Sequence, residues 1–158
     1  MRRASLLLVA TALLLALSAG AAWAKVFVGT NAADTIRGTM AADLIYGKGG
    51  NDRLFGLGER DIITGQANND VIRGGGGADR LSGADANDII YGGTGEDSIT
   101  GDTGNDTIVV GDDDKTPDQV WCGTGTDTVY AFGKDHSNLL SDRNGCENVI
   151  SFKGTPQL

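Results

Sequence analysis

The stretch Gly92-Gly93-Thr94-Gly95-Glu96-Asp97-Ser98-Ile99-Thr100 is one complete copy of a nonapeptide that the chain repeats. Its aspartate recurs every nine residues from Asp34 to Asp106. A glycine stands five residues before each of these aspartates, and an Ile or Leu stands two residues after it. A short fixed period is typical of a solenoid, in which each repeat buries its apolar residue by stacking on its neighbours. The sequence therefore predicts an all-β chain of stacked repeats.

The residue types within one nonapeptide predict a tight turn followed by a short strand. Glycine tolerates positive φ, so residues 92–97 can turn with converging carbonyl groups, and Asp97 closes the turn. Residues 98–100 suit a three-residue strand with Ile99 pointing inward. Successive strands then lie on opposite sides of a flattened coil, so that one winding takes 18 residues. Strands two repeats apart stack in parallel, about 4.8 Å from each other.

This stacking places the aspartates in two rows. One row contains Asp34, Asp52, Asp70, Asp88 and Asp106, and the other contains Asp43, Asp61, Asp79 and Asp97. At an effective dielectric constant of about 20, two carboxylates one winding apart repel each other by roughly 3 kcal/mol. A hard divalent cation between consecutive turns removes this repulsion and takes carbonyl oxygens as further ligands. Calcium fits best because it accepts about six to eight oxygen ligands in irregular geometry.

The pattern Gly-Gly-x-Gly-x-Asp-x-apolar-x resembles the calcium-binding repeats of the repeats-in-toxin (haemolysin-type) family. The resemblance covers residues 29–109 closely and reaches loosely to residue 150. It implies a right-handed parallel β-roll in a secreted bacterial protein, with calcium held between one turn and the turn two repeats later. Pairs of such turns give four potential sites in the first aspartate row and three in the second, seven in all.

Individual turns match this pattern to different degrees. The turns at residues 74–79 and 92–97 match fully, so we expect the best site between them. Its expected backbone ligands are the turn glycines Gly74, Gly75, Gly77, Gly92, Gly93 and Gly95.

Other turns depart at the fourth position, where the pattern has glycine. The turns ending at Asp34, Asp43 and Asp88 have Ala32, Ala41 and Ala86 there. Asn68 is tolerable because asparagine visits the left-handed region, whereas Glu59 fits worst. For these turns in particular, the alternative interpretation is an aspartate that forms the turn by hydrogen-bonding its own backbone.

The pattern weakens at both ends of the repeat region. Lys25 takes the place of an aspartate before the half-turn Val26-Phe27-Val28, which predicts a cap that binds no metal. After Asp106 the register slips by three residues before Asp118 and Asp127 resume the Asp-x-apolar unit. We expect Asp127 to be a ligand and Asp118, which follows a proline, to be a poorer one. Glu147-Asn148-Val149 can mimic one last half-turn, while residues 112–114 lack EF-hand spacing and predict a solvated loop.

The first 24 residues predict a secretory signal peptide. Arg2 and Arg3 precede an apolar run at residues 6–17, and Ala22-Trp23-Ala24 fits a cleavage site, so we expect cleavage after Ala24. A retained membrane anchor is the alternative, and the choice between the general and the twin-arginine export route stays open. We assign residues 25–109 to the β-roll and residues 110–158 to irregular repeats and a C-terminal cap.

Cysteine content and charge agree with export. Cys122 and Cys146 are the two cysteines, so in an oxidising compartment we expect them to form a disulfide that pins the cap. The full chain has 13 basic and 21 acidic residues. Residues 1–24 contain two of the basic residues and none of the acidic ones, so the net charge passes from −8 to −10 on cleavage. This charge disfavours nucleic acid and anionic lipid as partners, and it favours cations.

No catalytic motif is recognisable in the sequence. His136 is the single histidine and falls in a polar segment, and there is no metalloprotease, nucleophile-elbow or phosphate-loop motif. We therefore predict a non-enzymatic calcium-binding protein; an enzyme with an unrecognised site is the least favoured alternative.

The second alternative is an adhesion module that binds a glycan or a protein. It would use the outward ladder of one sheet, whose members are Arg37, Phe55, Arg73, Tyr91 and Val109. Such a ladder is more often cross-strand stacking with cation–π contacts.

Overall fold

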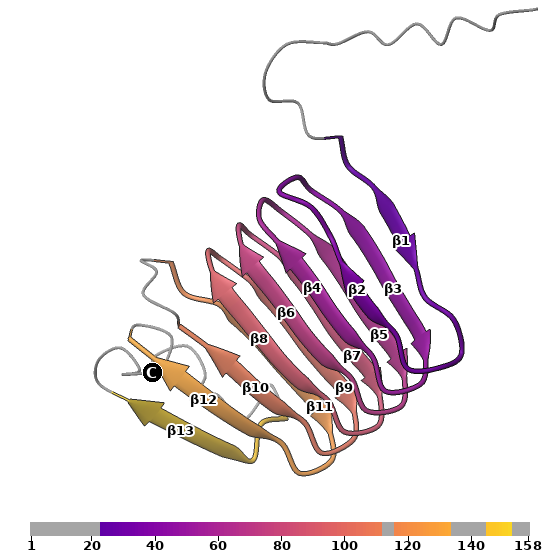
Figure 1. Ribbon diagram of the computed structural model, residues 1–158. Coiled ribbons are helices and arrows are strands. Elements are labelled where there is room, and N and C mark those ends of the chain that lie inside the picture. Colours follow the sequence, from indigo (N-terminus) through magenta and orange to yellow (C-terminus); the bar gives the residue numbers. More distant parts are fainter. Residues whose placement is uncertain (1–22, 112–115, 134–144, 153–158) are drawn as a thin grey trace, which may run out of the picture.

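The computed structural model describes residues 23–111, 116–133 and 145–152, and its regular elements are all strands. They form two parallel sheets that face each other along the whole roll (Figure 1). The first sheet consists of β1 (Val26–Val28), β3 (Leu44–Gly49), β5 (Ile62–Ala67), β7 (Arg80–Asp85), β9 (Ser98–Thr103) and β11 (Gln119–Thr124). The second consists of β2 (Thr35–Arg37), β4 (Arg53–Leu57), β6 (Val71–Gly76), β8 (Ile89–Thr94), β10 (Thr107–Val110), β12 (Thr128–Phe132) and β13 (Asn148–Phe152). The fold is thus a parallel β-solenoid, as the nine-residue period predicts.

The registers of the strands confirm the predicted 18-residue winding. In the first sheet Ile45 pairs with Ile63 and Ile63 with Leu81, and in the second Leu54 pairs with Ile72. The step widens between β9 and β11, where Ile99 pairs with Val120. This wider step absorbs the three-residue slip that follows Asp106.

The predicted strand length is wrong. Most strands have five or six residues, because parallel pairing continues through the glycine that follows the apolar residue. Strand β9, for example, extends beyond Thr100 to Thr103, and Asp102 and Thr103 pair with Gly123 and Thr124 of β11. Glycine at the inward position lets the backbones of consecutive windings approach closely, which keeps the ladder intact.

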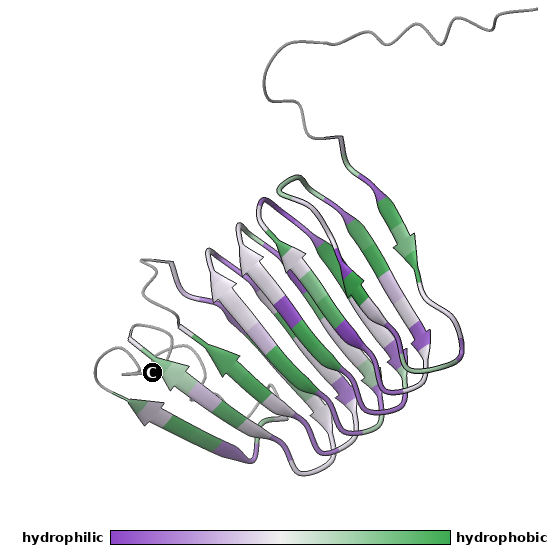
Figure 2. Cartoon of the chain, viewed as in Figure 1, coloured by the Kyte–Doolittle hydropathy of each residue, from purple (hydrophilic) through white to green (hydrophobic). Residues whose placement is uncertain are grey.

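The core is a double row of apolar side chains between the two sheets. Figure 2 shows apolar bands that continue from strand to strand. Fully buried members include Ile45, Leu54, Ile63, Ile72, Leu81, Ile90, Ile99, Ile108, Val120 and Val129. Phe27, Ile36 and Val149 are only partly buried, because they lie at the ends of the stack. At about 1.5–3 kcal/mol for each buried side chain, this row stabilises the stack along its full length.

A disulfide holds the C-terminal end of the roll. At the C-terminal end, Cys122 and Cys146 form the predicted disulfide, with Cα atoms 5.1 Å apart. It ties β11 of one sheet to Cys146, two residues before β13 of the other. The described residues contain no helix that could cross a lipid bilayer.

Candidate metal centre

The aspartates of the repeat lie inside the roll. Along each strand the inward positions are the aspartate, the apolar residue and the next glycine, and Asp97, Ile99 and Gly101 are all buried in this way. The buried carboxylates, each at most 4% exposed, belong to Asp43, Asp52, Asp61, Asp70, Asp79, Asp88, Asp97, Asp106, Asp118 and Asp127. Carboxylates are rarely this buried without a partner. Each therefore requires a counterpart inside the fold.

One oxygen of each carboxylate has such a counterpart in the preceding winding. The backbone N–H of Asp34 donates to Oδ1 of Asp52 over 2.7 Å, and the N–H of Asp61 donates to Oδ1 of Asp79 over 2.7 Å. The same bond repeats along both rows. The first row runs through Asp34, Asp52, Asp70, Asp88, Asp106 and Asp127 to Glu147, and the second from Lys25 through Asp43, Asp61, Asp79 and Asp97 to Asp118.

The other oxygen, Oδ2, is left over. It is buried and accepts no hydrogen bond in Asp52, Asp61, Asp70, Asp79, Asp88, Asp106 and Asp127. A buried polar atom without a partner costs about 1–3 kcal/mol, and more when it carries charge. Because these atoms recur at the same position of each repeat, they indicate a position suited to a positively charged ligand.

The space next to Oδ2 is lined by a glycine and a carbonyl group. A Cβ built on Gly47 would lie 2.5 Å from Oδ2 of Asp52 and 2.7 Å from the carbonyl oxygen of Gly65 in the next winding. The corresponding contacts recur at Gly56, Gly65, Gly74, Gly83 and Gly101, and also in the first two turns, where the distances to Oδ2 are 3.0 Å at Gly29 and 2.8 Å at Gly38. Carboxylate and carbonyl oxygens are hard donors, so this set fits calcium and offers nothing to a metal that prefers sulfur or nitrogen.

The turns at residues 74–79 and 92–97, which match the pattern fully, stack directly on each other. Gly75, Gly77, Gly93 and Gly95 all have positive φ. A side chain on Gly93 would collide with the carbonyl group of Gly75, and one on Gly95 with that of Gly77. The predicted backbone ligands are therefore held where only glycine fits without strain.

Other turns reach the same conformation without glycine. Positive φ occurs at the second or fourth turn position in Lys48, Leu57, Glu59, Gln66, Asn68, Ala84, Ala86 and Asp102. Glu59 and Ala86, which fit the pattern poorly, therefore have φ of 65° and 83°. An L-residue in this region costs of the order of 1 kcal/mol, so these turns store strain that the stack must offset.

The first two turns differ from all of these. Asp34 Oδ2 accepts hydrogen bonds from the backbone N–H of Thr30 at 2.6 Å and from its hydroxyl at 2.8 Å. Thr39 binds Oδ2 of Asp43 in the same way, at 2.5 and 2.8 Å. Neither Ala32 nor Ala41 is among the residues with positive φ. Threonine thus satisfies the oxygen that is left over in later turns.

The pKa values separate the same two groups. Burial raises the pKa of Asp61, Asp70 and Asp106 to about 6 and that of Asp79 and Asp88 to about 7, and neighbouring carboxylates add to the rise. Hydrogen bonds from Thr30 lower the pKa of Asp34. In Asp43 burial is the largest influence and acts upward, but hydrogen bonds from Lys25 and Thr39 outweigh it and lower the pKa.

Two acidic residues have larger roles than the sequence indicates. Asp118, which we expected to be a poorer ligand, is 1% exposed, and its Oδ1 accepts the N–H of Asp97. Glu147 Oε2 accepts the N–H of Asp127 at 2.8 Å, so it ends the first row as the last half-turn predicts. The Asp-x-apolar unit places both positions, since Asp118 and Glu147 stand two residues before the buried Val120 and the partly buried Val149.

The expectations for His136 and for a solvated loop at residues 112–114 remain predictions. His136 and residues 112–114 lie outside the described residues. No group of three His, Cys, Asp or Glu side chains that could hold a metal occurs in the part of the chain that the structure describes. A metal site among the described residues would therefore combine one or two carboxylates with backbone oxygens.

The outward ladder of the second sheet forms the cross-strand contacts that sequence reasoning favours. Arg37 lies over the ring of Phe55 at 4.6 Å from its centroid, and Arg73 lies over Tyr91 at 4.5 Å. Each guanidinium group thus covers one face of the ring on the neighbouring strand. The contacts match a stabilising role for this ladder.

Comparison with known proteins gives one family. The model of the RTX (repeats-in-toxin) calcium-binding nonapeptide repeat matches in four copies, at residues 28–63, 46–81, 55–90 and 82–114. These matches span more than half of the chain, and they identify no catalytic domain. No curated protein and no solved structure shows significant similarity to the chain. The repeat geometry and the family match agree, and the chain belongs to the RTX calcium-binding nonapeptide repeat family.

Proposed function

We propose that this chain is a secreted, non-catalytic calcium-binding protein whose folding is driven by Ca²⁺ held between stacked turns. The observation that supports the proposal most strongly is the series of buried Oδ2 atoms without hydrogen bonds, from Asp52 to Asp127. Folding without a cation would leave these charges buried and facing one another. Bound calcium supplies the positive charge that offsets their burial.

The proposed ligands are the carboxylates from Asp52 onward together with the carbonyl oxygens of the stacked turns. This set keeps Asp52, Asp61, Asp70, Asp79, Asp88, Asp97, Asp106 and Asp127 from the sequence assignment and adds Asp118. Asp34 and Asp43 are left out because threonine already satisfies their second oxygen. The sites are then expected between Asp52 and Asp127 in one row and between Asp61 and Asp118 in the other.

This arrangement couples folding to the calcium concentration. Where calcium is scarce the repelling carboxylates favour the unfolded chain, and where it is abundant each bound ion adds to the free energy of folding. Extracellular calcium-binding modules commonly have dissociation constants of about 10⁻⁴–10⁻³ M. We therefore expect a chain that stays unfolded inside the cell and folds after export, with the signal peptide removed after Ala24.

A calcium titration of the chelator-treated protein tests this proposal. Far-UV circular dichroism should show a cooperative change from coil to β-structure near millimolar calcium, and magnesium should not reproduce it. Asp79→Ala should move the midpoint to higher calcium. A protein that is fully folded in chelator and does not respond to calcium would refute the proposal.

Export has its own test. Expression of the full chain in a bacterial host, followed by mass spectrometry of the protein outside the cytoplasm, should show a chain that begins at Lys25. Recovery of the protein with residues 1–24 attached, in the membrane fraction, would contradict signal-peptide cleavage.

A further inference from the structure

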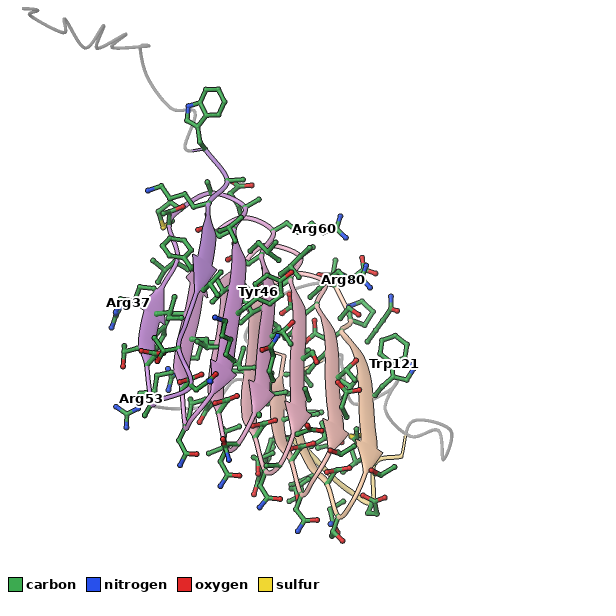
Figure 3. The ribbon with its side chains drawn as sticks, turned by 90° about the vertical axis from the view of Figure 1, so that its right-hand side faces the viewer. Arg37, Tyr46, Arg53, Arg60, Arg80 and Trp121 are labelled. Carbon is green, nitrogen blue, oxygen red and sulfur yellow. A yellow bond between two sulfur atoms is a disulfide. The ribbon has the colours of Figure 1, made fainter. Side chains whose placement is uncertain are left out.

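The outer face of the first sheet has a cleft that the metal sites do not explain. It has a volume of about 510 Å³ and lies at the edge where the Asp79 and Asp97 turns meet strands β7, β9 and β11. The side chains that give it its chemistry are Arg60, Arg80, Glu96, Ser98, Gln119 and Trp121. In Figure 3, Arg60, Arg80 and Trp121 lie along the right-hand side of the roll, whereas Arg53 lies at its left. Ala78 between them is small, which leaves the hollow open.

The guanidinium groups of Arg60 and Arg80 carry two positive charges in this cleft. The backbone N–H of Arg80 donates to the carbonyl oxygen of Asp61, but among the described residues neither guanidinium group makes a hydrogen bond or an ion pair, and both residues are exposed. Arg37 and Arg73 of the other sheet are instead held over aromatic rings. Glu96 and the buried Asp79 and Asp97 also line the cleft, so its preference for an anion rests on the calcium proposed above, which offsets the charge of these two aspartates. A guanidinium group binds a carboxylate through two parallel hydrogen bonds.

The rest of the cleft suits a sugar. Trp121 is 43% exposed, and an indole presents a large apolar face together with an N–H donor. Glu96 and Gln119, whose side chains lie 3.4 Å apart at the rim, offer acceptors and donors for hydroxyl groups.

The hollow also continues across the sheet. A smaller depression of about 180 Å³ shares Arg80 and Ser98 with the cleft. It is lined by the hydroxyl residues Thr64, Ser82 and Thr100, and Thr100 pairs in register with Trp121. The strands that it crosses lie about 4.8 Å apart, so a ligand along this path must be elongated.

We propose that this face binds an acidic oligosaccharide, with a sugar carboxylate on Arg60 and Arg80 and a sugar ring on Trp121. Nucleic acid carries a charge on every nucleotide, so the net negative charge of the chain disfavours it more than an oligosaccharide in which only some sugars are charged. An acidic peptide would use the two arginines but would leave the row of hydroxyl groups unused. This site borders the proposed calcium sites, because Asp79 and Asp97 also line the cleft, and it lies on the other sheet from the arginine–aromatic ladder.

Calorimetric titration of the full chain in saturating calcium tests the proposal, with circular dichroism as a check that the protein is folded. The probe is a tetrasaccharide of alternating glucuronic acid and N-acetylglucosamine, and its neutral counterpart is the N-acetylglucosamine tetramer. The acidic probe should bind at least roughly tenfold more tightly than the neutral one, since hydrogen bonds to charged groups are the stronger ones. Equal binding of both, or no binding of the acidic probe at millimolar concentration, would overturn the proposal. Tighter binding of tetraglutamate would also overturn it, in favour of a peptide ligand.

Matched variants locate the site. Arg80 directly follows Asp79 and Arg53 directly follows Asp52, so both occupy the same position of the repeat, but Arg53 does not line the cleft. Arg80→Gln and Arg60→Gln should each weaken binding roughly tenfold, while Arg53→Gln should leave it within about twofold. Trp121→Leu should weaken binding of both sugars without changing the calcium midpoint of folding. If Arg53→Gln weakens binding as much as Arg80→Gln, attraction is only general and the assigned cleft is wrong.

Discussion

The turns closed by Asp34 and Asp43 and the turns from Asp52 onward carry the same aspartate in the same register, but they satisfy it differently. In the first two turns a threonine at the second position donates both its N–H and its hydroxyl to Oδ2. In the later turns Oδ2 is buried without a hydrogen bond beside a glycine and a carbonyl group. One residue type at one position thus separates a turn in which Oδ2 accepts hydrogen bonds from turns in which it accepts none.

The two ends of the roll are held by different interactions. The two threonine-capped turns lie at the N-terminal end, where Lys25 donates its backbone N–H to Asp43. The C-terminal end is held instead by the Cys122–Cys146 disulfide and by Glu147, which ends the first row. Both ends are therefore fixed by covalent or hydrogen-bonding means, and the proposed calcium-dependent turns lie between them.

The largest expected effect is that of pH on the metal-free protein. The raised pKa values, about 7 for Asp79 and Asp88, mean that the folded chain binds protons more tightly than the unfolded one. Stability from these groups is fully present below about pH 4 and is lost as the pH rises through about 6 to 7. In chelator, circular dichroism should therefore show more β-structure at pH 5 than at pH 8.

The first two turns should respond in the opposite sense. The lowered pKa values of Asp34 and Asp43 give stability above the usual aspartate range that is lost in stronger acid. If the chelated protein is equally folded at pH 5 and pH 8, the later carboxylates are not the groups that oppose folding.

A pair of glycine substitutions gives the next effect. A Cβ on Gly74 would collide with Asp79 Oδ2 and lie 2.5 Å from the carbonyl oxygen of Gly92, so Gly74→Ala should cost about 1–3 kcal/mol in saturating calcium. Gly76→Ala is the matched control, because its nearest neighbour is the Thr94 hydroxyl at 3.4 Å. It should stay within about 0.5 kcal/mol. Urea unfolding measures the stability of both variants. Equal losses of stability would show that the space beside Oδ2 is no more restricted than the space at Gly76.

Neutralising one aspartate in each region tests the comparison directly. Asp79→Asn removes a charged ligand, so the calcium midpoint of folding should rise roughly tenfold. Asp43→Asn weakens hydrogen bonds from Lys25 and Thr39, so it should lower stability while leaving the midpoint within about twofold. Calcium titrations of both variants by circular dichroism decide this. A tenfold shift in Asp43→Asn would place calcium in the first turns as well.

The smallest effect concerns the threonine cap itself. Thr39→Val removes the hydroxyl that donates to Asp43 and accepts the N–H of Ala41, so it should cost about 1 kcal/mol. This cost should be the same at two calcium concentrations above the folding midpoint. Thr35→Val, at an exposed position of β2, is the control and should change little. A cost for Thr39→Val that grows with calcium would contradict a metal-independent cap.

Much of this molecule could be predicted from its period. The 18-residue winding and the inward Ile and Leu residues follow from repetition alone, since only stacking in register buries every apolar residue. The disulfide follows from two cysteines in a chain predicted to be exported. Pairing through Gly101 to Thr103 was not predicted, because strand propensities say little about a glycine that lets two backbones approach closely.

The site was less accessible to sequence reasoning. The aspartate spacing locates the carboxylates, but it does not reveal that Oδ1 binds the N–H of the preceding winding, because that bond joins residues 18 positions apart. The sequence also does not reveal what the difference between Thr39 and Gln66 at the second turn position does, because that depends on the backbone conformation. Thr39 turns its hydroxyl to Asp43, whereas Gln66 has a φ of 82°.

A crystal structure of the calcium-loaded protein, with the ions located by anomalous scattering, tests the central claim most directly. We expect calcium ions next to Oδ2 of the aspartates from Asp52 to Asp127, with carbonyl oxygens of the adjacent winding as further ligands. We expect no ion next to Asp34 and Asp43, because Thr30 and Thr39 donate hydrogen bonds to the corresponding Oδ2 atoms. A folded roll in saturating calcium without ions at the later aspartates, or with ions displacing both threonines, would contradict it.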